Sequence, residues 1–191
     1  MEIPAFDSPK FSFLTSKRAP WISAVRQILG KDANLVHKGC FLSLPGSAAQ
    51  VYHQDGVHLC ADKQKSCHAV NVFFPLCDMT ELLGPTEFCL GSHYLGSDYY
   101  VKENCIKPLA KAGMPIMFDY RLGHRGLANR SDEARPVVYL TYTVRGFKDK
   151  LNFSRKRYHK LGSLVGLPVS REERAKKRAD TALLVRDSKT N

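Results

Sequence analysis

Two histidines and one aspartate have the residue types and the spacing of a metal site. His53 and Asp55 are separated by a single residue, and His124 follows much later in the chain. Two neutral imidazoles and one carboxylate make up the facial triad that binds Fe(II) and leaves coordination positions open. Open positions admit a chelating acid and O2 beside the iron. The three residues therefore predict an iron site suited to oxidative chemistry.

Arg135 stands eleven positions after His124. A chelating acid such as 2-oxoglutarate has a second carboxylate, which needs a cationic partner away from the metal. The planar guanidinium of arginine binds a carboxylate through two parallel hydrogen bonds. The four residues together predict a metal, a cosubstrate and a class of reaction.

The elements that position these residues are expected to be strands. Short runs rich in β-branched and aromatic residues begin at Gly39 and are separated by turns rich in Gly and Pro, a pattern typical of sandwiches, barrels and jelly rolls. The runs are Cys40–Leu44, Ala69–Phe74, Met114–Phe118 and Val137–Val144. We predict a mainly β, cupin-like jelly roll, in which His53 and Asp55 share one face of a strand and His124 comes from a distant strand.

Helical periodicity is confined to the ends of the chain. Apolar residues recur at helical spacing from Trp21 to Leu29, and Gly30 is expected to end that helix. Ser170 and Glu173 form a capping box that predicts a charged helix reaching about Val185. We therefore expect an N-terminal segment at 1–38, an oxygenase-type core at 39–147 and a basic, partly helical tail at 148–191.

Composition narrows the class of protein. A chain of 191 residues is long enough for one domain with a sizeable core. It has no apolar run of membrane-spanning length, and Met1–Lys17 lacks the pattern of a signal peptide. These features predict a cytoplasmic protein without a membrane segment.

The six cysteines are scattered, so free thiols are expected, with Cys89 as a small core residue. The spacing of Cys60, Cys67 and His68 does not fit a zinc knuckle.

The positive charge lies in the tail. Residues 145–191 hold 14 Lys and Arg against 5 Asp and Glu, whereas residues 1–144 hold 15 against 13. The helix predicted there, from Ser170 to about Val185, has no interleaved aromatic residues, and the tail has no recognition motif, so nothing favours nucleic-acid binding over a solvated helix.

Three motifs around these residues make the pattern more specific. They are Gln50-Val-Tyr-His-Gln-Asp-Gly56, Leu83-Gly-Pro-Thr-Glu-Phe-Cys-Leu-Gly-Ser-His93 and His124-Arg-Gly-Leu-Ala-Asn-Arg-Ser131, followed by Arg135. In this order, from about Leu29 to Val144, the chain resembles the phytanoyl-CoA dioxygenase family. Those proteins are Fe(II)- and 2-oxoglutarate-dependent oxygenases built on a double-stranded β-helix.

The resemblance implies a role for particular residues. His53, Asp55 and His124 match the iron ligands, and Arg135 matches the arginine that binds the far carboxylate of 2-oxoglutarate. Two further residues, Thr86 and Gln50, match positions that contact the cosubstrate in some members. Asn71 stands where members often carry a tryptophan whose N–H reaches 2-oxoglutarate, so an amide there is a departure from the family. His58, His93 and Asn129 are expected to support or line the site.

The implied reaction is hydroxylation of a small organic or acyl substrate, in which O2 and 2-oxoglutarate are consumed and succinate and CO2 are released. Asp55 favours oxygenation over halogenation, because halogenases of this type replace the carboxylate with a small residue. The alternative is a non-catalytic, cupin-like protein that binds a metal or ligand. That alternative is motivated by the short N-terminal segment, since family members usually carry more residues that cover the active site.

Overall fold

The computed structural model describes residues 11–56, 65–95 and 102–149. All of them belong to one compact unit, Ile3–Asn152, whereas the second unit, Phe153–Asn191, lies wholly outside the described residues. Three features named above lie outside the described residues: the predicted tail helix, His58 and Cys60.

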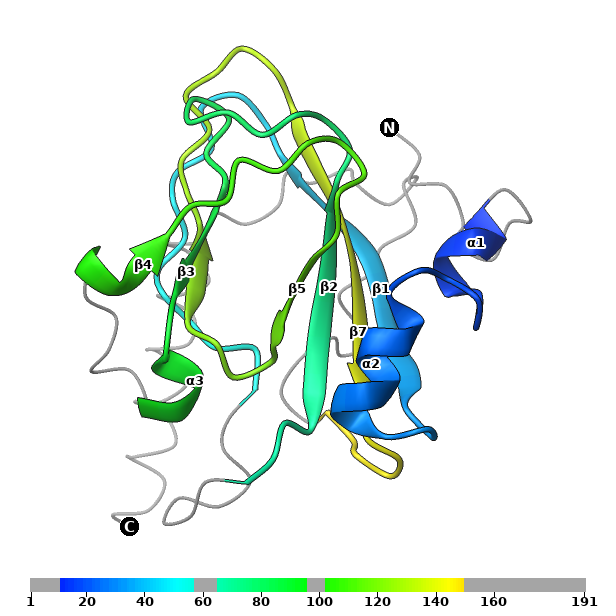
Figure 1. Cartoon of the computed structure of the whole chain (residues 1–191). Coiled ribbons are helices and arrows are strands. Elements are labelled where there is room, and N and C mark those ends of the chain that lie inside the picture. Colours follow the sequence, from blue (N-terminus) through cyan, green and yellow to red (C-terminus); the bar gives the residue numbers. More distant parts are fainter. Residues whose placement is uncertain (1–10, 57–64, 96–101, 150–191) are drawn as a thin grey trace, which may run out of the picture. The chain divides into compact units, whose positions relative to one another are not determined.

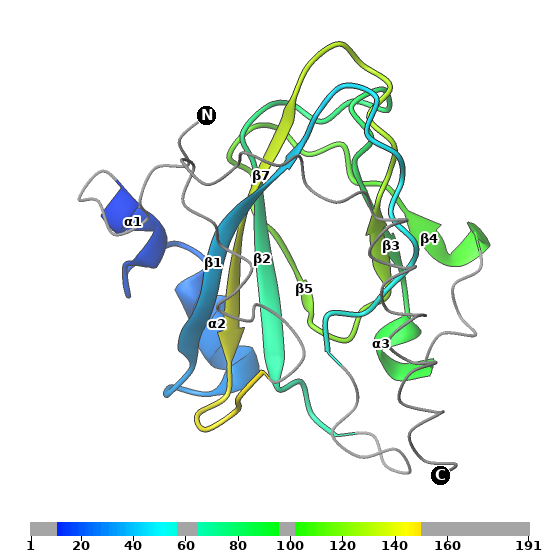
Figure 2. The ribbon, with the colours of Figure 1, turned by 180° about the vertical axis from the view of Figure 1, so that it is seen from behind.

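The structure is mainly β, as predicted, with two antiparallel sheets (Figures 1 and 2). A four-stranded sheet has the order β1-β7-β2-β5 and a three-stranded sheet has the order β4-β3-β6. The strands are β1 (Asn34–Ser43), β2 (Ala69–Pro75), β3 (Thr86–Cys89), β4 (Cys105–Ile106), β5 (Ile116–Asp119), β6 (His124–Gly126) and β7 (Arg135–Thr143). The helices are α1 (Ser12–Thr15), α2 (Ile22–Leu29), α3 (Ser92–Leu95) and the 3-10 turn η3 (Lys102–Asn104). Among the described residues, no helix is long and apolar enough to cross a membrane.

The predicted runs correspond to β1, β2, β5 and β7, and the predicted helix corresponds to α2. Gly30 ends α2 with a φ of 91°, a left-handed conformation that glycine adopts at little cost. The first strand begins at Asn34, five residues before the boundary expected at Gly39. Strands β3 and β4 were not predicted, and β6 was expected only as the distant strand of His124, because none of the three contains a longer run of β-branched and aromatic residues.

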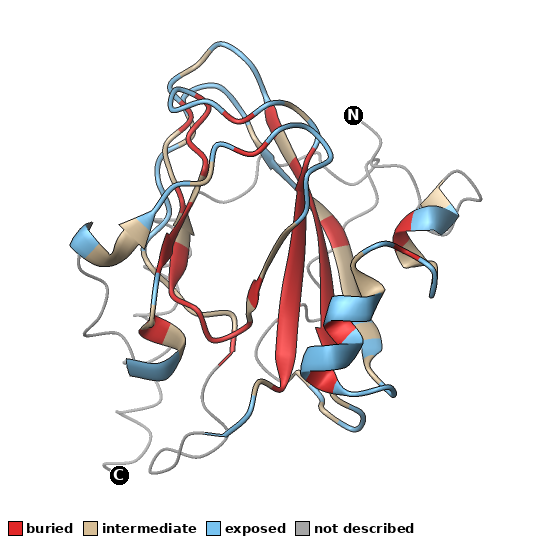
Figure 3. Ribbon diagram, viewed as in Figure 1, coloured by how far each residue is buried: buried red, intermediate tan, exposed pale blue. Residues whose placement is uncertain are grey.

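Alternation along the four-stranded sheet separates a hydrophobic core from a face that carries polar and aromatic side chains. On the outer face, side chains of β2 and β7 pack against α2, which also shows a buried and an exposed side in Figure 3. These core residues are Val25, Leu29, Val70, Val72, Phe74, Val138, Leu140 and Tyr142. Trp21 closes one edge of this core by donating its indole N–H to the Tyr142 hydroxyl at 3.0 Å.

The opposite, inner face of the same sheet carries polar and aromatic side chains. It presents Asn71 and Phe73 from β2, Thr141 from β7 and Phe118 from β5, and all four are buried. Strand β2 is therefore buried along its whole length, as Figure 3 shows. Because one face of the sheet forms the core, the side chains of the other face are available to build a functional site.

The expectation of free thiols is wrong for two cysteines. Cys89 and Cys105 form a disulfide, whereas Cys40, Cys67 and Cys77 are free. The two bonded residues lie directly opposite each other on β3 and β4. They are 16 residues apart in sequence, and the pairing of two unpredicted strands is what brings them together.

Candidate metal centre

His53 and His124 form a directly paired position between two antiparallel segments. The His53 N–H donates to the His124 carbonyl at 3.0 Å, and the His124 N–H donates to the His53 carbonyl at 2.9 Å. Both rings therefore project to the same side, with centroids 4.5 Å apart. The segment around His53 pairs with β6 through an isolated bridge and is not the regular strand that was predicted.

Asp55 completes the group. One ligand atom from each of His53, Asp55 and His124 lies within 4.8 Å of the others, a grouping that can hold a metal ion. The Asp55 carboxylate oxygens lie 3.9 Å from His53 Nε2 and 3.7 Å from His124 Nε2. Sequence spacing thus placed these three residues together correctly.

Backbone carbonyls orient both imidazoles. His53 Nδ1 lies 3.0 Å from the Val51 carbonyl oxygen, and His124 Nδ1 lies 2.9 Å from the Leu122 carbonyl oxygen. A carbonyl oxygen only accepts hydrogen bonds, so each Nδ1 carries the proton and each Nε2 presents its lone pair. This is the arrangement usual for histidines that bind metals through Nε2.

The histidines differ in their exposure to solvent. The His124 side chain is 4% exposed, against 35% for His53 and 23% for Asp55. Burial lowers the pKa of His124, which keeps its imidazole neutral, although the nearby Asp55 charge acts in the opposite direction. The rings of Phe88 and Phe118 pack beside the buried ring of His124. The group is thus open on the side of His53 and Asp55.

Asn71 holds the aspartate. Its Nδ2 donates to Asp55 Oδ2 at 2.6 Å, and its Oδ1 accepts a hydrogen bond from the Thr141 hydroxyl at 2.7 Å. Asn71 and Thr141 are both buried, so this chain of hydrogen bonds fixes the carboxylate from the inner face of the large sheet. The amide suggested for the cosubstrate thus has Asp55 as a partner, a contact that the sequence did not indicate.

Arg135 is a buried cation without a carboxylate partner among the described residues. Its only hydrogen bonds there are long ones, 3.4 Å each, from Nη1 to the carbonyls of Leu83 and Leu127, and its Nε has no partner. Burial lowers the pKa of its guanidinium, yet arginine stays charged in proteins. A buried positive charge of this kind is costly unless an anion binds it.

A cavity of about 330 Å³ lies beside Arg135 and is also lined by Gln50 and Gly126. Gln50 Oε1 accepts a hydrogen bond from the Gly126 N–H at 2.9 Å. A Cβ at residue 126 would lie 3.1 Å from Arg135 Nη2 and 3.2 Å from Gln50 Oε1, so the glycine keeps this space open. Thr86 lies directly opposite Gly126 on β3. The residues around this cavity are thus neighbours: Gln50, Thr86, Gly126 and Arg135.

Other predicted residues have different surroundings. Asn129 is buried and donates to the carbonyls of Ser43 and Glu133, so it ties the loop before β7 to the end of β1. His93 lies half-buried on α3. Neither belongs to the metal-binding group among the described residues.

A polar cluster formed by Tyr52, Glu87 and Arg125 was not predicted from the sequence. The Tyr52 hydroxyl and the Arg125 Nε both donate to Glu87 Oε2, at 2.6 and 2.7 Å. Burial raises the pKa of Tyr52 to about 12, and Glu87 adds to this effect. Burial also acts to raise the pKa of Glu87, but the hydrogen bonds from Tyr52 and Arg125 outweigh it, and that pKa is lowered. Tyr52 and Arg125 each adjoin a histidine of the group, so alternation alone could have placed both on the opposite face.

Solved structures share this architecture. The nickel complex of the non-heme monooxygenase ThoJ is 25% identical, with a TM-score of 0.54 over 66% of this chain and 53% of that one. AviO1 from Streptomyces viridochromogenes Tue57 is 19% identical, with a TM-score of 0.60 over 74% of this chain and 64% of that one. EctD from S. alaskensis with 2-oxoglutarate and 5-hydroxyectoine is 20% identical, with a TM-score of 0.59 over 72% of this chain and 53% of that one. At these low identities, the similarity to AviO1 and EctD shows a shared fold and no more.

The chain spans between 53% and 64% of the length of these three proteins. The model of the phytanoyl-CoA dioxygenase family matches residues 5–137. That match covers more than half of the chain, including both histidines, the aspartate and Arg135. The chain therefore belongs to the phytanoyl-CoA dioxygenase family.

Proposed function

We propose that this chain is an Fe(II)- and 2-oxoglutarate-dependent dioxygenase that hydroxylates a small organic or acyl substrate. The observation that carries the proposal is the pairing of a three-residue ligand group with a buried arginine beside a cavity, an arginine that has no carboxylate partner within the described part of the chain. A metal site alone would fit many functions. A metal site with a fixed cation nearby fits a chelating acid that has a second carboxylate.

His53, Asp55 and His124 would hold the iron. The chemistry of these donors fits Fe(II), because two neutral imidazoles and one carboxylate are the ligands of the facial triad. Both Nε2 atoms are presented as lone pairs, and Asp55 is held by Asn71. The protein needs only small adjustments of these side chains to bind a metal.

Arg135 would bind the far carboxylate of 2-oxoglutarate. Its guanidinium has free donor capacity and lies at the cavity that also contains Gln50 and Gly126. A dicarboxylate bound there would neutralise a buried charge that has no carboxylate partner in residues 11–56, 65–95 and 102–149. Gln50 and Thr86 are placed to shape the cavity around it.

Bound Fe(II) and 2-oxoglutarate supply the activation of O2, with succinate and CO2 as the products of the cosubstrate. The chain supplies orientation and protection. Asn71 and Thr141 keep the Asp55 carboxylate in one position, while Phe88 and Phe118 exclude water from the buried side of His124. With Asp55 present as a ligand, we propose hydroxylation as the outcome.

Coupled binding tests the proposal. Calorimetric titration of the full chain with Fe(II) without O2, with and without 2-oxoglutarate, should show that each ligand strengthens binding of the other. The variant His53→Ala should lose Fe(II) binding, whereas the control His93→Ala, a histidine outside the ligand group, should keep it. Fe(II) binding that survives in His53→Ala would overturn the assignment of ligands.

The non-catalytic alternative predicts a different result. A protein that only binds a metal or ligand should show no coupling between Fe(II) and 2-oxoglutarate. It should also form no succinate when O2 is admitted with a panel of candidate substrates. Succinate formation that depends on both His53 and Arg135 would exclude that alternative.

A further inference from the structure

A polar cluster lies on the outer face of the three-stranded sheet, behind the metal ligands. Phe88 lies opposite His124 in the register of β3 and β6, so their side chains share the inner face. Glu87 lies opposite Arg125 one residue along, and side chains alternate between faces. Glu87 and Arg125 therefore point away from the metal-binding group.

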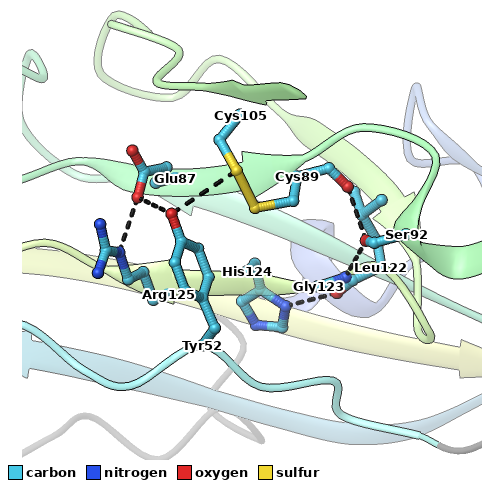
Figure 4. The surroundings of a disulfide bond; sticks show 9 residues. All are labelled: Tyr52, Glu87, Cys89, Ser92, Cys105, Leu122, Gly123, His124 and Arg125. Carbon is cyan, nitrogen blue, oxygen red and sulfur yellow. Dashed lines mark hydrogen bonds and ion pairs between the residues drawn. A yellow bond between two sulfur atoms is a disulfide. The ribbon is translucent and has the colours of Figure 1, made fainter. Parts of the chain in front are cut away.

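Tyr52 joins this cluster from the segment that carries His53. Its hydroxyl donates to the same Glu87 oxygen that accepts from Arg125, and the Arg125 guanidinium lies 4.1 Å from the centre of the Tyr52 ring (Figure 4). Tyr52 and Arg125 are the chain neighbours of His53 and His124. The three side chains thus join the two histidine-bearing segments through β3, in addition to the two backbone hydrogen bonds of the His53–His124 bridge.

The disulfide adjoins the same cluster. Cys89 follows Glu87 by two residues on β3, so the disulfide shares the outer face, and the Tyr52 hydroxyl oxygen lies 3.6 Å from Cys105 Sγ (Figure 4). Strand β4 consists of two residues and, among the strands that the structure describes, pairs only with β3. The Cys89–Cys105 disulfide therefore helps to keep Cys105 in contact with Tyr52.

The Cys89 backbone links the disulfide to β6 as well. The Cys89 N–H donates to the Gly123 carbonyl at 2.8 Å. The Ser92 hydroxyl donates to the Cys89 carbonyl at 2.6 Å and accepts from the Gly123 N–H at 2.7 Å. Gly123 is the residue immediately before His124. A displacement of Cys89 would thus also shift Gly123, and with it the buried His124, through these hydrogen bonds.

We propose that Tyr52, Glu87 and Arg125 are positioning residues for the two histidines, and that the Cys89–Cys105 disulfide is a thiol-exchange site whose state changes metal affinity. This inference rests on the proposed function, because it requires His53 and His124 to bind the metal. The described part of the chain contains three free, half-buried cysteines and one disulfide. This mixture fits a protein in which reduced and oxidised cysteines coexist.

The exchange reaction has a simple balance. Two thiols of a small reductant such as glutathione convert the disulfide into the Cys89 and Cys105 thiols and are themselves oxidised to a disulfide. Half-buried Cys105 is the more accessible sulfur, since Cys89 is fully buried. Two thiols need more room than one S–S bond, so β4 and Cys105 must shift relative to Tyr52. The reduced form should therefore bind metal more weakly.

The first experiment measures the dissociation constant of Co(II), a spectroscopic probe for Fe(II), for the full chain without O2. Tyr52→Phe removes only the hydroxyl and should weaken Co(II) binding about fivefold, which is less than the 10- to 100-fold loss typical of direct partners of metal ligands. Glu87→Gln keeps the size of the side chain and one acceptor oxygen, and should weaken binding less. Tyr142→Phe is the matched control, because it likewise removes a hydrogen-bonded tyrosine hydroxyl, one that accepts from Trp21 on the far face of the large sheet. It should leave Co(II) affinity unchanged.

The second experiment compares oxidised protein with protein reduced by a phosphine, with thiols counted by mass spectrometry. Reduction and the variant Cys105→Ser should both weaken Co(II) binding about fivefold, again below the loss expected for direct partners. The free-thiol control Cys77→Ser should have no effect. In Tyr52→Phe, reduction should weaken binding by a smaller factor than in the wild type, because the contact that transmits it is missing.

The outcomes separate this inference from the proposed function. If the wild type binds no Co(II), the proposed metal site fails. If the wild type binds Co(II) and neither reduction nor Tyr52→Phe, Glu87→Gln or Cys105→Ser changes the affinity, the metal site stands and the positioning role is wrong. Melting temperatures taken on the same samples identify a variant that does not fold, in which case reduction of the wild type alone decides.

Discussion

Each oxygen of the Asp55 carboxylate has its own neighbour. Oδ2 accepts the hydrogen bond from Asn71 and lies 3.7 Å from His124 Nε2, whereas Oδ1 lies 3.9 Å from His53 Nε2. A carboxylate held through one oxygen can offer the other to a metal as a single ligand atom. In the proposed metal site, Asn71 and Thr141 would therefore act on the metal by restricting the rotation of Asp55.

Replacing Asn71 by leucine tests this role. The variant Asn71→Leu keeps the approximate volume and removes the donor to Asp55, so we expect metal affinity to fall about 10- to 100-fold, as for other hydrogen-bond partners of metal ligands. Titration with Fe(II) in the absence of O2 measures the change. The exposed Asn34, at the start of β1, provides the control variant Asn34→Leu. An affinity equal to that of the wild type would show that Asp55 needs no such support.

Substitution of Arg135 should weaken the binding of 2-oxoglutarate and leave the binding of the metal unchanged. Arg135→Gln removes a buried cation, and loss of one partner of a buried charge pair costs at least about 2 kcal/mol, or roughly 30-fold in the dissociation constant of 2-oxoglutarate. Arg135→Lys keeps the charge but loses the planar pair of donors, so its loss should be smaller. Equilibrium binding of 2-oxoglutarate to the Fe(II)-loaded chain measures both, with the exposed Arg130→Gln as control. Unchanged 2-oxoglutarate binding in Arg135→Gln would contradict the assignment.

At the scale of elements, β2 and β7 each serve two purposes. Val70, Val72 and Leu140 face α2 and form the core, whereas the alternate residues Asn71 and Thr141 face the metal-binding group. A rigid core on one face thus fixes the position of polar side chains on the other. The turn between β5 and β6 carries the chain from one sheet to the other, and His124 is the first residue after it.

A buried ion pair holds that turn. Arg121 Nε and Nη2 donate to the two oxygens of Asp119 at 2.9 and 2.8 Å, and Nη1 donates to the Lys65 carbonyl at 2.9 Å. Burial acts to raise the pKa of Asp119, but its hydrogen bonds with Arg121 outweigh this effect and lower it. The folded protein therefore favours the ionised carboxylate more strongly than the unfolded chain does.

The stability of the protein should follow this shift. Asp119→Asn leaves Arg121 buried without its partner and should lower the free energy of unfolding at neutral pH by about 3 kcal/mol or more. Because the folded pKa lies below the unfolded value of about 3.9, the contribution is complete above that pH and is lost as pH falls further. Urea unfolding at several pH values should thus show the gap between wild type and variant narrowing below about pH 4. The exposed pair of Asp78 and Lys111 gives the control Asp78→Asn, which should change stability little. A gap independent of pH would contradict the prediction.

At the scale of the whole molecule, the ligand group joins parts of the chain that are distant in sequence. His53 and Asp55 come from the segment after β1, His124 comes from β6, and Asn71 reaches them from β2. A metal that binds only when these parts are assembled must stabilise the folded state against the unfolded chain.

Thermal unfolding should reveal that linkage. At a free Co(II) concentration 100 times its dissociation constant, the folded state gains about 2.7 kcal/mol, so the melting temperature should rise by roughly 5 to 10 °C for a chain of this size. Asp55→Ala should show no such rise, whereas Asp32→Ala, an exposed aspartate paired with Arg145, should retain it. An equal rise in Asp55→Ala would mean that Co(II) binds elsewhere.

Much of the architecture could be predicted from the sequence. The long strands β1, β2 and β7 and the helix α2 were predictable because their periodicity extends over enough residues to be recognised. The motifs around His53, His124 and Arg135 predicted which residues come together, since their types and order suit one kind of chemistry. The family match confirmed the family that those motifs indicated.

The tertiary structure decided the contacts between these motifs. Asn71 donates to Asp55 because β2 faces the segment after β1, and Cys89 is bonded to Cys105 because β3 pairs with β4. Glu87 receives both Tyr52 and Arg125 because β3 lies beside β6 and its neighbouring segment. Residue types and spacing determine which side chains are capable of binding a metal, since that depends on their chemistry and local order. The partners that hold those side chains depend on strand order and register, which short strands do not encode locally.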